Sequence, residues 1–290
     1  MLKYLFTNLE KVIYPSIRNH TPGLLILCCV SVLTLMSCGS NTAKESEGFR
    51  KWEEKDWGIY SNPYRVVEAV KNRDISEFAS LCRYPIIREY PLKDIRDSVE
   101  MMRKFQVIFD DSLINKISQT TPDDWEEYGW RGLTFGRGEF LWLDENVYAI
   151  TYQSAKEKTE LEKLTDRDLK SLPSDLSKGW KPEFCFLDTV SSKVYRIDIK
   201  ENQDSEEEEK IRVIIADLQN INDFTSWEII DGIKKIEGTM GVRSYYFPMK
   251  DGEEYSLSYI WQEDSAFLSD STADDYHDLQ KTYWIDLINP

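Results

Sequence analysis

Aromatic side chains are concentrated between residues 125 and 152, where they could take part in ligand binding. Among them are Trp125, Tyr128, Trp130, Phe140, Trp142, Tyr148 and Tyr152. Aromatic faces stack on flat ring surfaces such as those of sugars, and the guanidinium of Arg131 in the same segment could pair with a carboxylate. Any pocket here should therefore be lined by Trp130, Arg131, Trp142, Tyr152 and Gln153. Aromatic residues at alternating strand positions more often form the core of a sheet, and we favour that interpretation.

A metal centre is not expected. Downstream of Cys38 the sequence contains a single histidine, His277, whereas zinc sites usually draw on several histidine or cysteine ligands. The neighbouring acids lack the spacing and the central glycine of a dedicated calcium loop. We interpret this stretch as a solvated acidic turn; its acids are Asp270, Asp274, Asp275 and Asp278.

No catalytic or cofactor motif stands out either. The sequence has no G-x-S-x-G, G-x-G-x-x-G or Walker pattern, and "TFGRGEF" lies between two expected strands, which is typical of a hairpin. Cys82 and Cys185 lie in apolar runs, which indicates buried free thiols rather than nucleophiles. Glu139 and Asp144 flank turns, where carboxylates are normally solvated. We therefore expect no cofactor.

The segment that ends at Cys38 has the organisation of an export signal. The apolar run from Leu24 to Met36 is 13 residues long, too short to span a membrane comfortably but suited to the centre of a signal peptide. Leu35-Met36-Ser37-Cys38 resembles a bacterial lipobox. The resemblance implies a signal peptide over residues 1–37, cleavage before Cys38, and acyl chains such as palmitate on that cysteine. It places the protein at the bacterial outer membrane, anchored by lipid and facing the periplasm or the cell surface.

Composition separates a tether from a folded region. Residues 38–58 begin with the small and polar stretch "GSNTAKESEG", which is typical of a flexible linker. The whole chain carries −16 and residues 1–38 carry +2, which leaves −18 on the 252 residues after Cys38. A field of this sign repels nucleic acid, so we exclude nucleic acid as a partner. The expected partners are the membrane, through the lipid, and an envelope protein or a small ligand.

Helices are expected first and strands afterwards. Asn62-Pro63 is typical of a helix start, and Asp74 has the spacing to Glu77 of an N-terminal cap. Apolar residues at steps of three and four predict a third helix over about 94–116. Period-two patterns then predict a three-stranded meander over about 129–153, and Asp231-Gly232 and Asp251-Gly252 predict hairpins.

These patterns define an α+β fold, in which N-terminal helices pack on a curved antiparallel sheet and a mostly β C-terminal region follows. We expect an α+β domain over residues 59–200, with a charged, partly helical insertion at 156–183. A second, antiparallel β domain is expected over 206–290, after the acidic run Glu206–Glu209. The final stretch "LQKTYWIDLI" should add a strand or cover a sheet edge.

The stretch "VVEAVKNRDISEFASL" is similar to the opening of the nuclear transport factor 2-like superfamily, with a helix, a short turn and a second helix. The resemblance extends over roughly residues 60–200. It implies a cone-shaped fold with a pocket between helices and sheet, which some members use for catalysis and many only for binding. Fold alone does not choose between these uses.

Three functions remain open at this stage. The sequence favours a non-enzymatic binding or interaction module, because it combines a lipid anchor with aromatic-rich β structure and lacks catalytic motifs. A hydrolase or isomerase that uses carboxylate acid–base chemistry is the alternative, and it requires a pocket carboxylate with a raised pKa. A structural accessory of an envelope complex is the third, and it requires a large exposed apolar patch.

Overall fold

The computed structural model describes residues 53–58, 61–200, 209–237, 241–249, 252–261, 263–270 and 276–288. The expected signal peptide, Cys38 and the tether up to residue 52 lie outside these residues. Residues 51–290 form one compact unit. Among the described residues, no helix has the length and apolarity required to cross a membrane.

The first half of this unit begins with a set of short helices. Asp74, Asp97 and Asp110 cap three of them, each accepting a hydrogen bond from the backbone amide three residues further on. Asp110 divides the helix expected over 94–116 into two helices. Its backbone is extended, and its carboxylate accepts a hydrogen bond from the Leu113 amide, which begins a new helix. The helices are α1 (Glu54–Trp57), α2 (Ser61–Lys71), α3 (Ile75–Ser80), α4 (Ser98–Ile108) and α5 (Asp111–Ser118).

A four-stranded antiparallel meander follows these helices, in the order β1-β2-β3-β4. It has one strand more than expected, because the chain pairs before the 3₁₀ turn η2 (Gly129–Arg131) as well as after it. A second 3₁₀ turn, η1 (Pro122–Asp124), leads into the sheet. The strands are β1 (Trp125–Glu127), β2 (Leu133–Phe135), β3 (Leu141–Leu143) and β4 (Val147–Ile150).

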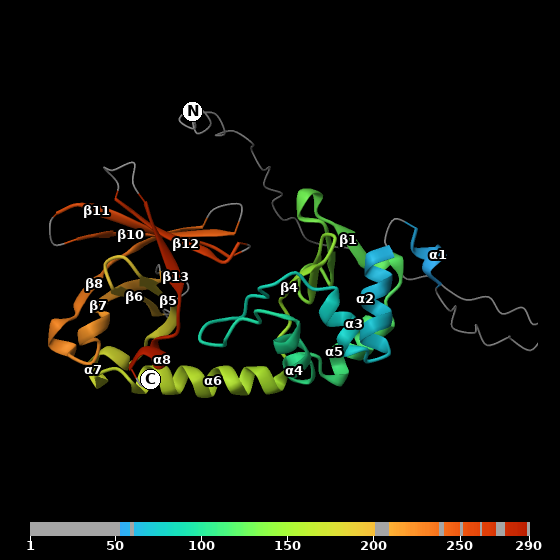
Figure 1. Cartoon of the computed structure of the whole chain (residues 1–290), viewed down its shortest axis with the longest axis horizontal. Coiled ribbons are helices and arrows are strands. Elements are labelled where there is room, and N and C mark those ends of the chain that lie inside the picture. Colours follow the sequence, from blue (N-terminus) through green and yellow to red (C-terminus); the bar gives the residue numbers. More distant parts are fainter. Residues whose placement is uncertain are drawn as a thin grey trace, which may run out of the picture. The chain divides into compact units, whose positions relative to one another are not determined.

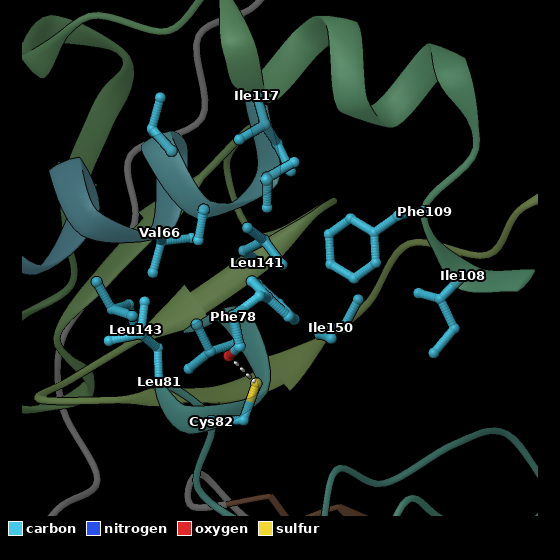
Figure 2. Packing of buried hydrophobic residues seen from close by; sticks show 14 of the residues in the cluster. Val66, Phe78, Leu81, Cys82, Ile108, Phe109, Ile117, Leu141, Leu143 and Ile150 are labelled. Carbon is cyan, nitrogen blue, oxygen red and sulfur yellow. Dashed lines mark hydrogen bonds between the residues drawn. The ribbon is translucent and has the colours of Figure 1, made fainter. Parts of the chain in front are cut away.

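One hydrophobic core joins the helices to this meander. Figure 2 shows Val66 of α2 and Phe78 of α3 beside Leu141 and Ile150 of the sheet. Phe109, just after α4, packs edge to face against Phe78, with ring centroids 4.7 Å apart. Helices packed on a curved antiparallel sheet are therefore present, as the α+β expectation requires.

The charged segment after the meander is mainly helical. Ser154 caps α6 (Ala155–Lys170), and Pro173 precedes α7 (Ser174–Ser177), so helix is found where the charged insertion was expected. In Figure 1, α6 runs from the region of α4 towards α8. The chain enters its second sheet directly afterwards, at Lys181.

The second half of the unit is a nine-stranded antiparallel sheet in the order β8-β7-β6-β5-β13-β12-β11-β10-β9. Between the strands lie the 3₁₀ turns η3 (Leu218–Asn220) and η4 (Phe224–Ser226), and the chain finishes in α8 (Trp284–Ile288). The strands are β5 (Lys181–Asp188), β6 (Lys193–Lys200), β7 (Lys210–Asp217), β8 (Glu228–Asp231), β9 (Lys234–Glu237), β10 (Val242–Pro248), β11 (Glu254–Ile260), β12 (Ser265–Asp270) and β13 (Tyr276–Lys281).

This sheet curves back on itself. Its two edge strands, β8 and β9, are consecutive in the chain and are joined by only Gly232 and Ile233. The hairpin expected at Asp231-Gly232 is therefore wrong, because Gly232, with φ +75°, turns the chain from one edge of the sheet to the other. The hairpin expected at Asp251-Gly252 is confirmed, since Pro248 of β10 lies opposite Glu254 of β11.

The two faces of the nine-stranded sheet have separate cores. In β5, Phe184 and Phe186 belong to a cluster that also contains residues of β6, β7 and β10–β13. Strands so far apart in the sheet can share one cluster only on the inside of its curve. Cys185, between the two phenylalanines, belongs instead to a cluster with Trp284 of α8 and Leu172, which follows α6. We call the first cluster the inner core and the second the outer core.

The nine-stranded sheet also crosses the expected boundary between residues 200 and 206. β6 pairs with β7 from Lys193↔Asp217 to Lys200↔Lys210, so strands on both sides of the boundary belong to one sheet. β13 lies between β5 and β12 rather than at an edge. A run of acidic residues indicates a solvated loop, but it does not reveal whether the strands beside it pair with each other.

Candidate ligand-binding site

A cavity of about 630 Å³ lies at one end of the curved sheet. Cavities of ~300–1,000 Å³ that combine apolar walls with a few polar groups are typical of small-molecule sites, and the mouth of a curved sheet is a common place for them. Two segments of the first half contribute to the wall: residues 87–90, and Ala149, Ile150, Thr151 and Gln153 around the end of β4. The sheet contributes Lys181, Pro182, Glu183, Phe184, Ile199, Glu209, Lys235, Arg243, Tyr259 and Trp261.

Glu183 reaches this cavity through a break in the strand pairing. Pro182 lies opposite Asp198 and Phe184 lies opposite Ile197, so Glu183 is an extra residue with no opposite partner in β6. Such a β-bulge re-aims the side chain of the extra residue, and bulges are common at sheet rims and beside functional sites. The Glu183 side chain is only 11% exposed. The bulge thus directs a carboxylate into the mouth of the sheet.

Two cationic side chains from β9 and β10, at one edge of the sheet, approach one oxygen of this carboxylate. Arg243 Nη1 of β10 donates to Glu183 Oε1 over 2.8 Å, and Lys235 Nζ of β9 lies 3.9 Å from the same oxygen. Lys235 Nζ is closer to Glu209 Oε2, at 3.3 Å. The second oxygen, Glu183 Oε2, is buried and has no hydrogen-bond partner among the residues that the structure describes.

Tyr245 of β10 brings a second buried polar atom close to Glu183. Its side chain is fully buried in the inner core, and its hydroxyl also lacks a hydrogen-bond partner within the described part of the chain. The hydroxyl is close enough to the carboxylate to influence its pKa, but the geometry is not that of a hydrogen bond. The Tyr245 hydroxyl therefore lies next to the carboxylate but within the inner core, and Tyr245 is not one of the residues that line the cavity.

Burial dominates the protonation of this pair. Loss of solvent raises the pKa of Glu183 above its ordinary value, although the charges of Lys235 and Arg243 act in the opposite direction. Burial also raises the pKa of Tyr245, and the neighbouring carboxylate raises it further. A carboxylate with a raised pKa beside a neutral phenol can accept a hydrogen bond or exchange a proton.

Aromatic side chains form the apolar part of the wall. The Phe184 and Tyr259 rings lie 4.9 Å apart, and Trp261, directly after β11, is half-buried beside them at the cavity. Gly241 fixes the place of the indole, because a Cβ at this position would lie 1.8 Å from Trp261 Nε1. Trp261 can therefore present its ring only because residue 241 has no side chain.

Salt bridges and hydrogen bonds hold the rim of the cavity. Lys181 Nζ and Gln153 Nε2 donate to the two oxygens of Glu89, over 2.8 and 2.9 Å. Partial burial opposes ionisation of Glu89, but these hydrogen bonds outweigh it and lower the pKa of Glu89. Next to it, Arg88 is buried and pairs with Glu157 of α6, over 2.8 Å at Nε. These pairs fix the loops of the first half against the mouth of the sheet.

A second buried network lies in the outer core, on the other face of the sheet from the inner core. Arg196 of β6 pairs with Asp168 of α6 over 2.5 Å and with Asp198 over 2.8 Å, and Asp198 pairs with Arg212 of β7 over 2.7 Å. Tyr90 donates to Asp168 over 3.2 Å. Two positive and two negative side chains balance, so we assign this network to the attachment of α6 to the sheet.

Of the five residues expected to line a pocket, Gln153 lies at this cavity. Trp142 donates instead to the Gly138 carbonyl of its own meander, over 3.2 Å. Tyr152 points towards α5, where its hydroxyl donates to Asp110 over 2.8 Å. The structure therefore places neither of these two aromatic residues at the cavity: Tyr152 packs against the core of the helices and the meander, and Trp142 is half-buried on the face of β3 opposite to the buried Leu141 and Leu143.

Arg131 is half-buried in the turn η2, where its carbonyl accepts a hydrogen bond from Tyr148, and it is not part of the cavity wall. The side chain of Trp130 lies outside the described part of the structure. Trp125 and Tyr148 are buried, as the core interpretation of the aromatic segment expects.

The two cysteines after the tether are free and buried, as their apolar surroundings indicate. Burial raises the pKa of Cys82 to about 12 and raises that of Cys185 as well, so both thiols are protonated at neutral pH. His277 is exposed on β13, and no cluster of metal-ligating side chains occurs among the described residues. Asp274 and Asp275 lie outside those residues.

Sequence patterns did not indicate Glu183, Tyr245 or Trp261 as site residues. The available clue is local: Glu183 is a charged residue between Pro182 and the apolar run Phe184-Cys185-Phe186. A charge and a proline at the start of a buried strand are typical of a bulge. Arg243 and Trp261 come from strands distant in sequence, so only the fold brings them to Glu183. Comparison with protein families, curated proteins and solved structures gives no match for this chain.

Proposed function

We propose that this chain is a lipid-anchored protein of the bacterial cell envelope that binds a small ligand in the cavity at the mouth of its nine-stranded sheet. The lipobox at Leu35–Cys38 supports the anchor, and the polar stretch after it supports a tether between membrane and folded unit. A diacylated or triacylated cysteine holds a protein almost permanently, since each buried methylene contributes ~0.8 kcal/mol.

The observation that carries the binding proposal is the carboxylate of Glu183 in the cavity wall. Glu183 Oε2 is buried without a hydrogen-bond partner among the described residues, and Glu183 lines a cavity of about 630 Å³ with aromatic walls. A buried polar group without a partner costs ~1–3 kcal/mol, so folded proteins rarely keep one without a reason. A ligand that hydrogen-bonds to this oxygen would remove the cost.

Thermal unfolding of the full chain in the presence of a chemically diverse small-molecule library tests the binding proposal. A ligand at a hundred times its Kd stabilises by ~2.7 kcal/mol, which raises Tm by about 5–10 °C for a unit of this size. The same ligand should give no such shift with Glu183→Ala or Trp261→Ala. If no compound stabilises the protein, or if the variants respond like wild type, small-ligand binding at this cavity is rejected.

A pocket enzyme is the second candidate, and the raised pKa of Glu183 favours it. A buried carboxyl group with a raised pKa can serve as a general acid or base. This function requires turnover of the bound ligand, with a rate that falls by at least about a hundredfold in Glu183→Gln. A ligand that binds and is recovered chemically unchanged after long incubation would exclude the enzyme and leave the binding module.

A further inference from the structure

We propose that the ligand is a neutral, hydroxyl-rich ring, the chemistry of a sugar unit in a glycan, with a hydroxyl on Glu183 and one ring face on Trp261. This inference rests on the proposed binding function and adds the class of ligand to it. Three features of the cavity support it: the hydrogen-bonding capacity of the Glu183 carboxylate, the balance of charges around it, and the aromatic wall.

The carboxylate requires a ligand that donates a hydrogen bond. Glu183 Oε2, as a carboxylate oxygen, accepts only. A ligand carbonyl or carboxylate would leave Glu183 Oε2 without a donor, whereas a ligand hydroxyl would satisfy it.

The charges around the cavity leave little for a charged ligand to pair with. Arg243 pairs with Glu183, Lys235 with Glu209, Lys181 with Glu89, and Arg88 with Glu157. An anionic or cationic ligand would have to lose hydration and would find each opposite charge already paired. A neutral ligand avoids this cost, because it exchanges hydrogen bonds with water for hydrogen bonds with the protein.

The aromatic wall suits the apolar face of a saturated ring. Trp261 is half-buried at the cavity, and Phe184 and Tyr259 continue the wall with ring centroids 4.9 Å apart. The electron-rich face of an aromatic ring attracts the weakly positive C–H groups of a sugar ring, while the hydroxyls at the ring edge remain free for polar partners. Trp261 and Glu183 would thus contact different parts of the same ligand.

The test is saturation-transfer NMR and calorimetry on the full chain in detergent, with a fixed panel of saccharides. The neutral probes are maltotriose, cellotriose, xylotriose, mannobiose, galactobiose and di-N-acetylchitobiose, and the charged ones are galacturonic acid and glucosamine. We expect at least one neutral probe to bind and the charged probes to bind at least tenfold more weakly. Glu183→Gln and Trp261→Ala should each weaken that binding by about tenfold or more.

Two matched variants serve as controls. Glu254→Gln changes an exposed carboxylate at the far end of β11, and Trp142→Ala changes a half-buried tryptophan of the meander. Both should leave saccharide affinity within twofold of wild type. Thermal unfolding of each variant establishes that it is folded before its affinity is measured.

The outcomes separate the two levels of the proposal. If no neutral saccharide binds, but an acid, an amine or another library compound binds with dependence on Glu183 and Trp261, the sugar inference is overturned and the binding function stands. If nothing binds, both are overturned. If a saccharide binds equally well to the Glu183 and Trp261 variants, the cavity is not its site and the inference fails.

Discussion

Glu183 is a residue whose position costs folding free energy. The fold moves a carboxylate out of water into a cavity where one of its oxygens has no partner among the described residues. Arg243 and Lys235 offset part of this desolvation, but the pKa of Glu183 remains raised. A group that destabilises the folded state and faces a cavity is typical of a binding or catalytic site, because residues needed for activity are often not those that give the highest stability.

The raised pKa of Glu183 predicts a pH-dependent stability difference between wild type and Glu183→Gln. Because the folded state binds the proton more tightly than the unfolded state, this group stabilises fully below the unfolded pKa of about 4.5, and the contribution is lost as pH rises through the folded pKa. At neutral pH the variant should therefore unfold at a Tm a few degrees higher, since 1 kcal/mol corresponds to about 2–4 °C. The gain should shrink as the pH is lowered to 4.

The matched control for this measurement is Glu254→Gln, where an exposed carboxylate is neutralised and no comparable gain is expected. Scanning calorimetry from pH 4 to pH 8 measures both variants. A Glu183→Gln protein that is less stable than wild type at pH 7 would show that the ion pair with Arg243 outweighs desolvation.

Two buried tyrosines provide a second comparison at the residue scale. The Tyr245 hydroxyl has no hydrogen-bond partner among the described residues, whereas that of Tyr90 donates to Asp168 and accepts from the Trp284 amide, over 3.2 and 3.0 Å. Tyr245→Phe should raise the free energy of unfolding by about 1–3 kcal/mol, because it removes a buried hydroxyl without a partner, and Tyr90→Phe should lower it by about 1–3 kcal/mol. Urea unfolding measures both; equal losses would contradict the assignment of the two hydroxyls.

At the scale of elements, the turn before β10 and the turn after β11 meet at Gly241 and Trp261. Gly241 and Gly252 both have positive φ, at +71° and +87°, so alanine is strained at either position. A Cβ at residue 252 meets nothing within 4 Å, but at residue 241 it would overlap the indole of Trp261. We expect Gly252→Ala to cost ~1 kcal/mol from backbone strain alone and Gly241→Ala to cost more.

The pair also tests the cavity, because only the change at residue 241 displaces the wall. Gly241→Ala should shift the tryptophan fluorescence and weaken ligand binding, while Gly252→Ala should do neither. Fluorescence spectra and the ligand-induced rise in Tm are the measurements. If both variants behaved alike, contact with Gly241 would not be what orients Trp261.

Local features were the most predictable part of the fold. The Asp74 cap, the hairpin at Asp251-Gly252 and the charged helix of α6 depend on residues a few positions apart, and the structure confirms them. Asp231-Gly232 has the same dipeptide, but there the following strand pairs with β10 rather than with β8. The residues of a turn specify that the chain reverses its direction. They do not specify which strand the next strand pairs with.

The site was less predictable for the same reason. The aromatic residues of 125–152 are dense in sequence, yet they fill the meander and its core. The cavity instead combines single residues of several strands, such as Glu183, Arg243 and Trp261, whose approach depends on the order of strands in the sheet. Sequence spacing carries little information about contacts of this kind.

At the scale of the whole molecule, the end of the chain forms the middle of the sheet. β13 joins β5 to β12, and Lys281 at its end forms a buried ion pair with Asp94 over 2.6 Å. A chain that ends at residue 275 should therefore fail to form the nine-stranded sheet. A chain that ends at Thr282 keeps β13 and should retain the sheet at reduced stability, since it loses the buried Trp284 of α8.

Circular dichroism and limited proteolysis compare these two truncations. Persistent strand signal and protease resistance after residue 181 in the shorter chain would contradict a central role for β13. The comparison also bears on the expected domain at 59–200, because β5 would then lack β13 as a neighbour.

The corner at Gly232 and Ile233 has a consequence for self-association. An open sheet normally exposes two long rows of backbone donors and acceptors that can recruit strands from other molecules. Here both rows belong to strands of four residues, β8 and β9, which follow one another around a single corner, and β9 begins with Lys234 and Lys235. A foreign strand would meet a short, bent and charged template. Copies crowded together at high concentration should therefore resist the edge-to-edge aggregation to which broad β-sheets are prone.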